Sequence, residues 1–300
     1  MFKRVLVATE ESHFSPQPLE KSAALCAKDA HIEWFQSVYN ASFEQATDSD
    51  AESQESALQL SIQHRLNQAE AHIDECDLPQ QVVPDMRWHP SFLKAALEQS
   101  QRYQPELMVV PRIQRHDLLD WLVGGDEQEL VNQLHGPLLL VNDKPWGVHP
   151  RVAVAIDPFH LDSRDDTLEK KLLGYADRIA NQLCAELHVV HCFQALPQSV
   201  IFDEHLVTDF DSLQTQVGEE HRARIEELLK PLDRPLGKPL LKLMVGETDE
   251  QLQRFCEEEQ IDILILGAPE KGWVERLLMG STTARLLNKL DQDLLIIHGF

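Results

Sequence analysis

Short apolar runs alternate with longer segments whose apolar residues recur every three or four positions along the whole chain. Continuous apolar runs are typical of strands buried on both faces of a sheet, and the periodic segments are typical of covering helices. The predicted strands are 4–9, 31–38, 82–88, 106–111 and 138–142, then 151–156, 186–193, 239–245, 261–267 and 293–298. The predicted helices are 17–29, 52–75, 91–103 and 126–135, then 166–183, 211–230, 249–259 and 281–290. The alternation predicts parallel sheets covered by helices on both faces.

The order of elements occurs twice. Apolar runs at 5–8 and 152–155 each precede an acid, Glu10 in the first half and Asp157 in the second. Later in each half, three features correspond at one offset of 156 residues: the runs 107–110 and 263–266, Gly124 and Gly280, and the runs 138–141 and 294–297. Unrelated apolar runs would not keep register with a glycine between them. The sequence therefore predicts a duplicated α/β domain.

The segment 142–150 contains two prolines and a glycine and separates the halves, as linkers do. We therefore expect one domain over 1–147 and a second over 148–300. Each is long enough to bury a core of its own.

The chain carries a formal net charge of −23 and 43% apolar residues, which indicates a globular acidic protein. The excess acid is divided almost evenly between the halves, so neither half offers a basic surface. This balance argues against nucleic acid and anionic membranes as direct partners.

Five dispersed cysteines without a C-x-x-C pair favour free thiols in a reducing compartment. The first apolar run, 5–8, is too short for the core of a signal peptide, and no later run is long enough to span a bilayer. We expect a cytoplasmic protein.

The fourth strand of the second half leads into the clearest candidate for chemistry. Gly267 ends this strand, and Gly280 and Ser281 open the next predicted helix. In doubly wound sheets ligands lie at the carboxyl ends of strands, where the strand order reverses. Glycines that permit close approach, together with a helix start carrying a hydroxyl, predict a phosphate-binding loop.

This loop resembles the ATP loop of the universal stress protein family, Gly-x2-Gly-x9-Gly-Ser/Thr. Gly267 matches the first glycine, Gly280 the last and Ser281 the hydroxyl, with Thr282 beside it. Glu270 occupies the place of the second glycine and would bring a carboxylate toward the phosphates. The resemblance implies ATP in the second domain, with Mg²⁺ only as a companion of the nucleotide.

The resemblance extends over nearly the whole chain. It implies that Asp157 contacts the nucleoside and that Cys192 lies beside the adenine. Segments 83–92 and 144–146 look like those of the tandem, E-type subgroup. The implied fold is two Rossmann-like domains of the adenine nucleotide alpha hydrolase kind, each with a five-stranded parallel sheet of order 3-2-1-4-5.

The first half departs further from the loop pattern. Pro111 and Gln114 replace its first two glycines, and Gly125 replaces its hydroxyl, while Glu10 replaces the acid. Proline restricts the backbone, and the missing hydroxyl removes a phosphate ligand. We expect no family-like ATP site in the first domain.

Each candidate also has a purely structural interpretation. Asp157 could cap a turn, Ser281 could cap a helix, and Gly267 could simply end a strand. His188 and His191 point to opposite faces of one strand, which favours core packing over a shared metal ion. Trp34 and Trp88, both on predicted strands, are expected in the core.

The resemblance implies a regulatory, stress-response function through a bound nucleotide or similar small ligand, rather than catalysis. The alternatives are a slow ATPase using the second-domain loop, a ligand-free scaffold, and cavities that hold a different ligand. It also implies that strands 138–141 and 294–297 pair the two domains within the chain. Further homodimerisation stays open.

Overall fold

A computed structural model of the 300-residue chain describes residues 1–10, 15–39, 51–112, 134, 136–159, 167–193, 210–232, 237–268 and 290–298. The predicted helices 126–135 and 281–290 lie outside these residues, apart from Leu134 and Leu290. No helix in the described part of the chain is long and apolar enough to cross a membrane.

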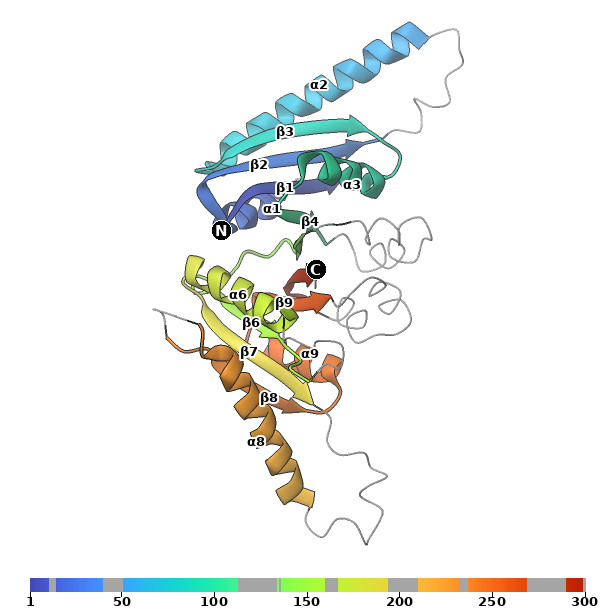
Figure 1. Cartoon of the computed structure of the whole chain (residues 1–300). Coiled ribbons are helices and arrows are strands. Elements are labelled where there is room, and N and C mark those ends of the chain that lie inside the picture. Colours follow the sequence, from blue (N-terminus) through green and yellow to red (C-terminus); the bar gives the residue numbers. More distant parts are fainter. Residues whose placement is uncertain are drawn as a thin grey trace. The chain divides into compact units, whose positions relative to one another are not determined.

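The chain forms two compact units, Met1–Pro145 and Trp146–Phe300, each drawn in Figure 1. The first unit contains β1 (Phe2–Glu10), α1 (Gln17–Leu25), β2 (Cys26–Val38), α2 (Ala51–Cys76), β3 (Gln81–Trp88), α3 (Phe92–Tyr103), β4 (Leu107–Pro111) and β5 (Leu138–Val141). The second contains β6 (Arg151–Ala155), α6 (Thr167–Gln182), β7 (Glu186–Phe193), α8 (Phe210–Leu229), β8 (Leu240–Val245), α9 (Thr248–Glu258), β9 (Ile263–Ala268) and β10 (Asp293–His298).

All strand pairs within each unit are parallel. In the first unit β1 lies between β2 and β4, β3 lies outside β2, and β5 lies outside β4. In the second unit β6 lies between β7 and β9, with β8 and β10 outside them. The first strand of each unit is therefore central, and the chain leaves it in one direction and later returns on the other side. This reversal places a switch point between β1 and β4, and another between β6 and β9.

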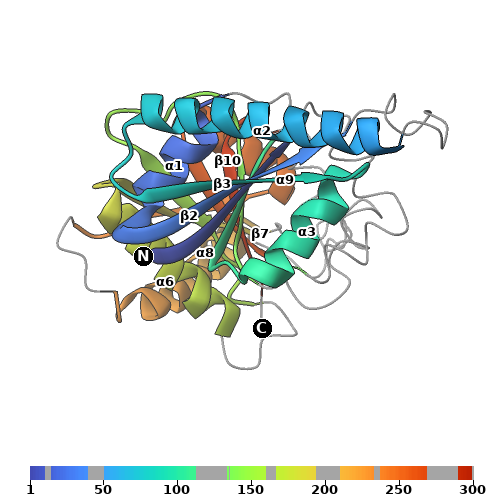
Figure 2. The same cartoon turned by 90° about the horizontal axis from the view of Figure 1, so that it is seen from above.

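Helices cover both faces of each sheet. Neighbouring residues of a strand point to opposite faces, so they contact different helices. Trp34 of β2 packs on His72 of α2, while the adjacent Glu33 bonds to Gln99 of α3. Figure 2 shows α1 and α2 on one side of these strands and α3 on the other. The apolar runs of the central strands are consequently buried on both faces, and Val5 and Val152 have no exposed surface.

Two local predictions are wrong. Residues 26–29 belong to β2 and not to the preceding helix, because Cys26 already pairs with Phe2 of β1. The register of the two strands then shifts, and the next pair is Arg4 with His31. Trp34 lies in the core as expected, but Trp88 is only half-buried. Trp88 lies on an edge strand, where its ring packs against Tyr39 with centroids 5.5 Å apart.

Hydrogen bonds attach the linker to the second unit. The Trp146 indole N–H donates to Asp293 Oδ2 (2.7 Å), and the Gly147 N–H donates to Asp262 Oδ1 (3.0 Å). Asp262 Oδ2 also accepts from the backbone N–H of Arg151 at 2.8 Å. These bonds explain why the compact units divide after Pro145, whereas the sequence suggested a boundary after residue 147.

In both units a lysine of the first helix donates a hydrogen bond to the backbone at the end of the fifth strand. Lys21 Nζ of α1 donates to the backbone oxygen of Asn142 (2.8 Å), and Lys171 Nζ of α6 donates to that of His298 (2.7 Å). Asn142 and His298 correspond through the same offset of 156 residues as the strands before them. Burial lowers the pKa of Lys171. The duplicated chain therefore repeats a side-chain contact as well as its strand order.

We expect Lys171→Met to lower the free energy of unfolding by about 1 kcal/mol, because it removes a charge-assisted hydrogen bond at a partly exposed position. Urea unfolding of the full chain measures the loss. Lys170→Met, at the exposed neighbouring position, is the matched control and should have a smaller effect. Equal losses in the two variants would contradict a stabilising role for the Lys171 contact.

Candidate functional site

Three predicted site residues lie at the carboxyl edge of the second sheet. Asp157 lies two residues beyond the end of β6, Cys192 lies near the end of β7, and Gly267 lies near the end of β9. Since β6 is between β7 and β9, the fold brings Asp157 and Gly267 to the switch point and Cys192 to the neighbouring strand of the same edge. Gly280, Ser281 and Thr282, like Glu270, lie outside the described residues.

Asp157 is exposed and folds its own turn. Its Oδ1 accepts the backbone N–H of Phe159 at 3.2 Å, the bond typical of an Asx turn. The structural interpretation of Asp157 as a turn-forming residue is thus correct. The same carboxylate is accessible from solvent at the place where a ligand of a doubly wound sheet would lie.

Cys192 is a half-buried neutral thiol. Burial raises the pKa of Cys192 to about 12, so the side chain remains protonated near neutral pH. A thiolate is the reactive form of cysteine, and this environment disfavours it. Cys192 therefore offers a polarizable, weakly polar contact surface and not a nucleophile.

Gly267 is closely approached by α6. A Cβ atom at this position would lie 3.1 Å from Leu168 Cδ2 and 3.1 Å from Leu172 Cδ1. That separation is shorter than ordinary van der Waals contact, so the missing side chain lets the helix pack against β9. This packing role was not predicted from the sequence, which considered only a strand end or a ligand contact.

A pair of histidines lies beside the Asx turn, and the sequence did not predict it. His191 Nε2 of β7 and His221 Nδ1 of α8 are 2.8 Å apart, and the ring of Phe159 packs on His221 with centroids 4.1 Å apart. His191 was expected to pack in the core and is buried there. No sequence signal linked it to His221, because the contact depends on how α8 lies on the sheet.

Near the carboxyl end of β1 in the first unit, side chains of β1 and β2 bond to each other. The buried Thr9 hydroxyl accepts from Trp34 Nε1 (2.9 Å) and from Gln36 Nε2 (3.2 Å). Pro111 ends β4 where Gly267 lies near the end of β9. The two units therefore share a fold but differ in the side chains at their switch points.

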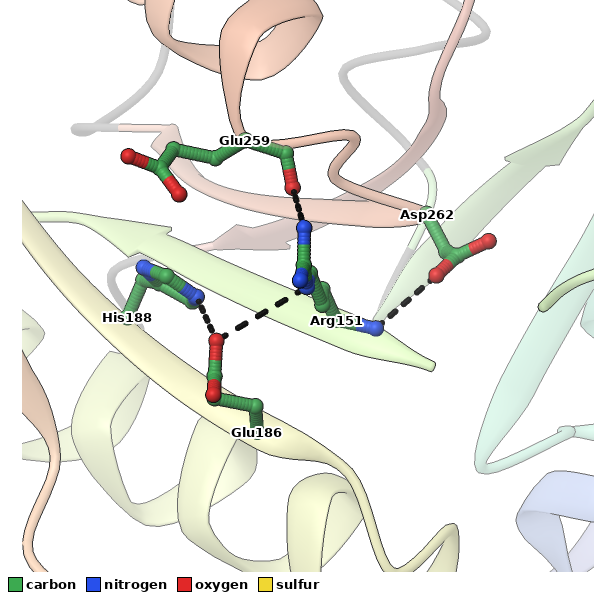
Figure 3. Close-up of polar contacts among 5 residues, drawn as sticks. All are labelled: Arg151, Glu186, His188, Glu259 and Asp262. Carbon is green, nitrogen blue, oxygen red and sulfur yellow. Dashed lines mark hydrogen bonds and ion pairs between the residues drawn. The ribbon is translucent and has the colours of Figure 1, made fainter. Parts of the chain in front are cut away.

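A second polar cluster lies at the opposite, amino edge of the second sheet (Figure 3). Glu186 Oε1 is 2.7 Å from His188 Nε2 and 3.7 Å from Arg151 Nε, and the Arg151 guanidinium donates to the backbone oxygen of Glu259 at 2.6 Å. His188 also packs edge-on against Phe255 of α9. These contacts hold strand starts together, which agrees with the structural interpretation of His188.

Metal binding finds no support in the described residues. His188 faces α9 whereas His191 faces α8, so the two imidazoles lie on opposite faces of β7 as predicted. Within the ranges that the structure describes, no group of three or more His, Cys, Asp and Glu side chains could hold a metal ion.

The parallel sheets, their central first strands and the residues gathered at the switch point define a tandem protein of the doubly wound α/β class. The chain belongs to the universal stress protein family, whose sequence pattern matches residues 1–142 and again residues 150–298. The family predicted from the loop and the repeat is thereby confirmed.

Similar proteins include tandem members of this family. The chain is 20% identical over 305 residues to a universal stress protein E homolog of Haemophilus influenzae, covering 98% of this chain and 96% of the relative. It is 21% identical to universal stress protein E of Escherichia coli K12 over 70% of this chain and 66% of that protein. A putative universal stress protein of Pseudomonas aeruginosa has the same fold, with a TM-score of 0.63 and 16% identity over 98% of this chain and 93% of its own.

Proposed function

We propose that the second unit binds an adenine nucleotide, or a similar anionic small ligand, and that the protein regulates a stress response in the cytoplasm through this ligand. The observation that supports the proposal is the gathering of Asp157, Cys192 and Gly267 at and beside the switch point of the second sheet. This is the place where doubly wound proteins bind their ligands.

The available side chains fit the nucleoside part of such a ligand. The exposed Asp157 carboxylate accepts hydrogen bonds from sugar hydroxyls, and the neutral Cys192 thiol provides a soft contact for a base. The phosphates would lie on the loop from Gly267 to Gly280, with Ser281 and Thr282 as hydroxyl donors. Mg²⁺ would accompany the nucleotide.

Binding is proposed without rapid turnover. Hydrolysis of a phosphoanhydride requires a group that positions water and a charge clamp on the transferred phosphoryl group. In the described part of the site, the Asp157 carboxylate engaged in its own turn, the protonated Cys192 thiol and backbone groups supply neither. We therefore place the protein among regulatory binding proteins and not among ATPases.

The first unit is proposed to be a degenerate copy that does not bind nucleotide. Trp34 and Gln36 of β2 both donate to the Thr9 hydroxyl near the end of β1, and Pro111 replaces the glycine of the loop. The domains thus have different roles although they share one fold.

The two units are also proposed to pair through their fifth strands, as a duplicated self-complementary surface would. Leu138–Val141 and residues 294–297 consist of large aliphatic residues, and an apolar edge strand left in water would promote aggregation.

We expect Asp157→Ala to weaken ATP binding to the full-length protein at least about tenfold, as loss of a hydrogen-bonding charge in a binding site does. Isothermal titration calorimetry measures the dissociation constant. The matched control is Glu10→Ala, which alters the corresponding acid of the first unit and should leave ATP affinity unchanged. If only the Glu10 variant lost ATP binding, the ligand would lie in the first unit and the proposal would be wrong.

A further inference from the structure

Two histidines form a directly bonded pair next to the proposed ligand site. His191 is 3% exposed, and its Nδ1 lies 2.8 Å from the backbone oxygen of Ile156. Its Nε2 lies 2.8 Å from Nδ1 of the half-buried His221. The pair thus connects the end of β6, which leads to Asp157, with α8 on the face of the sheet.

The partners of these nitrogens fix where protons reside. A carbonyl oxygen only accepts, so His191 Nδ1 carries a proton and donates to Ile156. In the neutral pair, His191 Nε2 then accepts from the N–H at Nδ1 of His221. One more proton fits on Nε2 of His221 without breaking either bond. A second would place two N–H groups against each other, so the pair takes up one proton and no more.

The surroundings of His221 are aromatic and moderately charged. Its ring lies 4.1 Å from the ring of Phe159 and 4.8 Å from that of Phe193, centroid to centroid. Burial, and then the neighbouring His191, lower the pKa of His221 below its usual 6.5. Glu220 on the same helix and Asp157 on the turn after β6 act in the opposite direction.

We propose that the His191–His221 pair is a one-proton switch that couples ligand binding at the second-unit site to pH. The pair takes up a proton when an anionic ligand binds at the second-unit site, because the negative charge of the bound ligand stabilises the imidazolium ion. This inference rests on the function proposed above and adds a means of regulation to that site.

The sign of the coupling follows from linkage. In the free protein, burial and the neighbouring His191 lower the pKa of His221, which disfavours its imidazolium form. A bound anion raises that pKa, and between the two values each binding event takes up one proton. Affinity therefore increases as the pH falls through this window, by at most about tenfold per pH unit for one proton. Outside the window the pair contributes no pH dependence.

The first test needs no ligand. Proton NMR of the full-length protein follows the imidazole rings from pH 8 to pH 5, with His221→Asn used to assign the pair. Asparagine places an N–H donor near the position of Nδ1 but does not titrate, and His221→Gln is a second variant if the first is unstable. We expect one protonation shared by both rings. Two independent protonations of the wild-type rings would overturn the proposal.

The second test uses ATP as the probe. Calorimetry at several pH values, in buffers of different ionisation enthalpy, gives the affinity and the protons taken up. From pH 7.5 to pH 5.5 we expect the affinity of the wild type to rise several-fold more than that of His221→Asn. Protonation of the phosphates affects both measurements equally, so the comparison removes it. Uncharged adenosine should show no such difference.

The outcomes separate the two proposals. Equal pH dependence in wild type and His221→Asn, with ATP bound by both, overturns the proton coupling and leaves the nucleotide site standing. Absence of ATP binding at every pH overturns the proposed function and the coupling together.

Discussion

Exchange of Glu270 for glycine is expected to tighten ATP binding to the full-length protein by about fivefold or more. Glu270 occupies the place of a loop glycine in the family pattern, and it lies outside the described residues, so the expectation comes from the sequence. A carboxylate a few ångströms from a phosphate costs about 1–4 kcal/mol at an effective dielectric constant near 20. Glycine removes this repulsion and frees the backbone N–H groups to turn toward the phosphates. Calorimetry on wild type and Glu270→Gly measures the gain.

Added salt should reduce the difference between the two proteins, because a repulsion near the surface is screened. Gly280→Val is the negative control, since a branched side chain at the helix start would obstruct the phosphates in either background. If Glu270→Gly leaves the affinity unchanged, or if wild type already binds as tightly as the variant, Glu270 does not face the phosphates.

The sequence predicts best the elements that are buried on both faces. The central strands are continuous apolar runs such as Val5 to Ala8, and parallel strands covered on both faces require such runs. The boundary of α1 was less predictable. Cys26 continues a helical pattern in the sequence, but its pairing with Phe2 makes it part of β2. A long-range contact thus overrides a local preference at that position.

The sequence could predict those residues of the candidate site whose position is set by the end of a single strand. Asp157 comes shortly after one buried strand and Gly267 lies near the end of another, and the switch point is a property of strand order, so their location at one edge was foreseeable. The histidine pair was not, because His191 and His221 are 30 residues apart and meet only through the packing of α8 on β7. The linker contacts of Trp146 and Gly147 have the same origin in tertiary packing.

Gly267 has two interpretations, as part of a phosphate loop and as a packing contact for α6, and the structure provides a way to separate them. The sequence assigns it to a phosphate loop, while its neighbours Leu168 and Leu172 show that α6 packs directly on its Cα. Its φ angle is not among the positive values of the described glycines, so the backbone itself would accept a side chain. A substitution at this position therefore tests space and not backbone strain.

Gly267→Val is expected to lower the free energy of unfolding by about 1–3 kcal/mol, as overpacking of a well-packed core does. Its Cβ would lie 3.1 Å from carbon atoms of both Leu168 and Leu172, and its two methyl groups would add to the crowding. Urea unfolding of the full chain measures the loss. Leu168→Ala in the Gly267→Val background is the matched test. Removing the leucine side chain opens space for the valine, so the two changes together should cost less than the sum of their separate effects.

If Gly267→Val retains wild-type stability but loses ATP binding, the glycine serves the ligand and α6 has room to move. If it loses stability while the folded variant still binds ATP with unchanged affinity, the glycine is a packing residue and the phosphate loop begins beyond it.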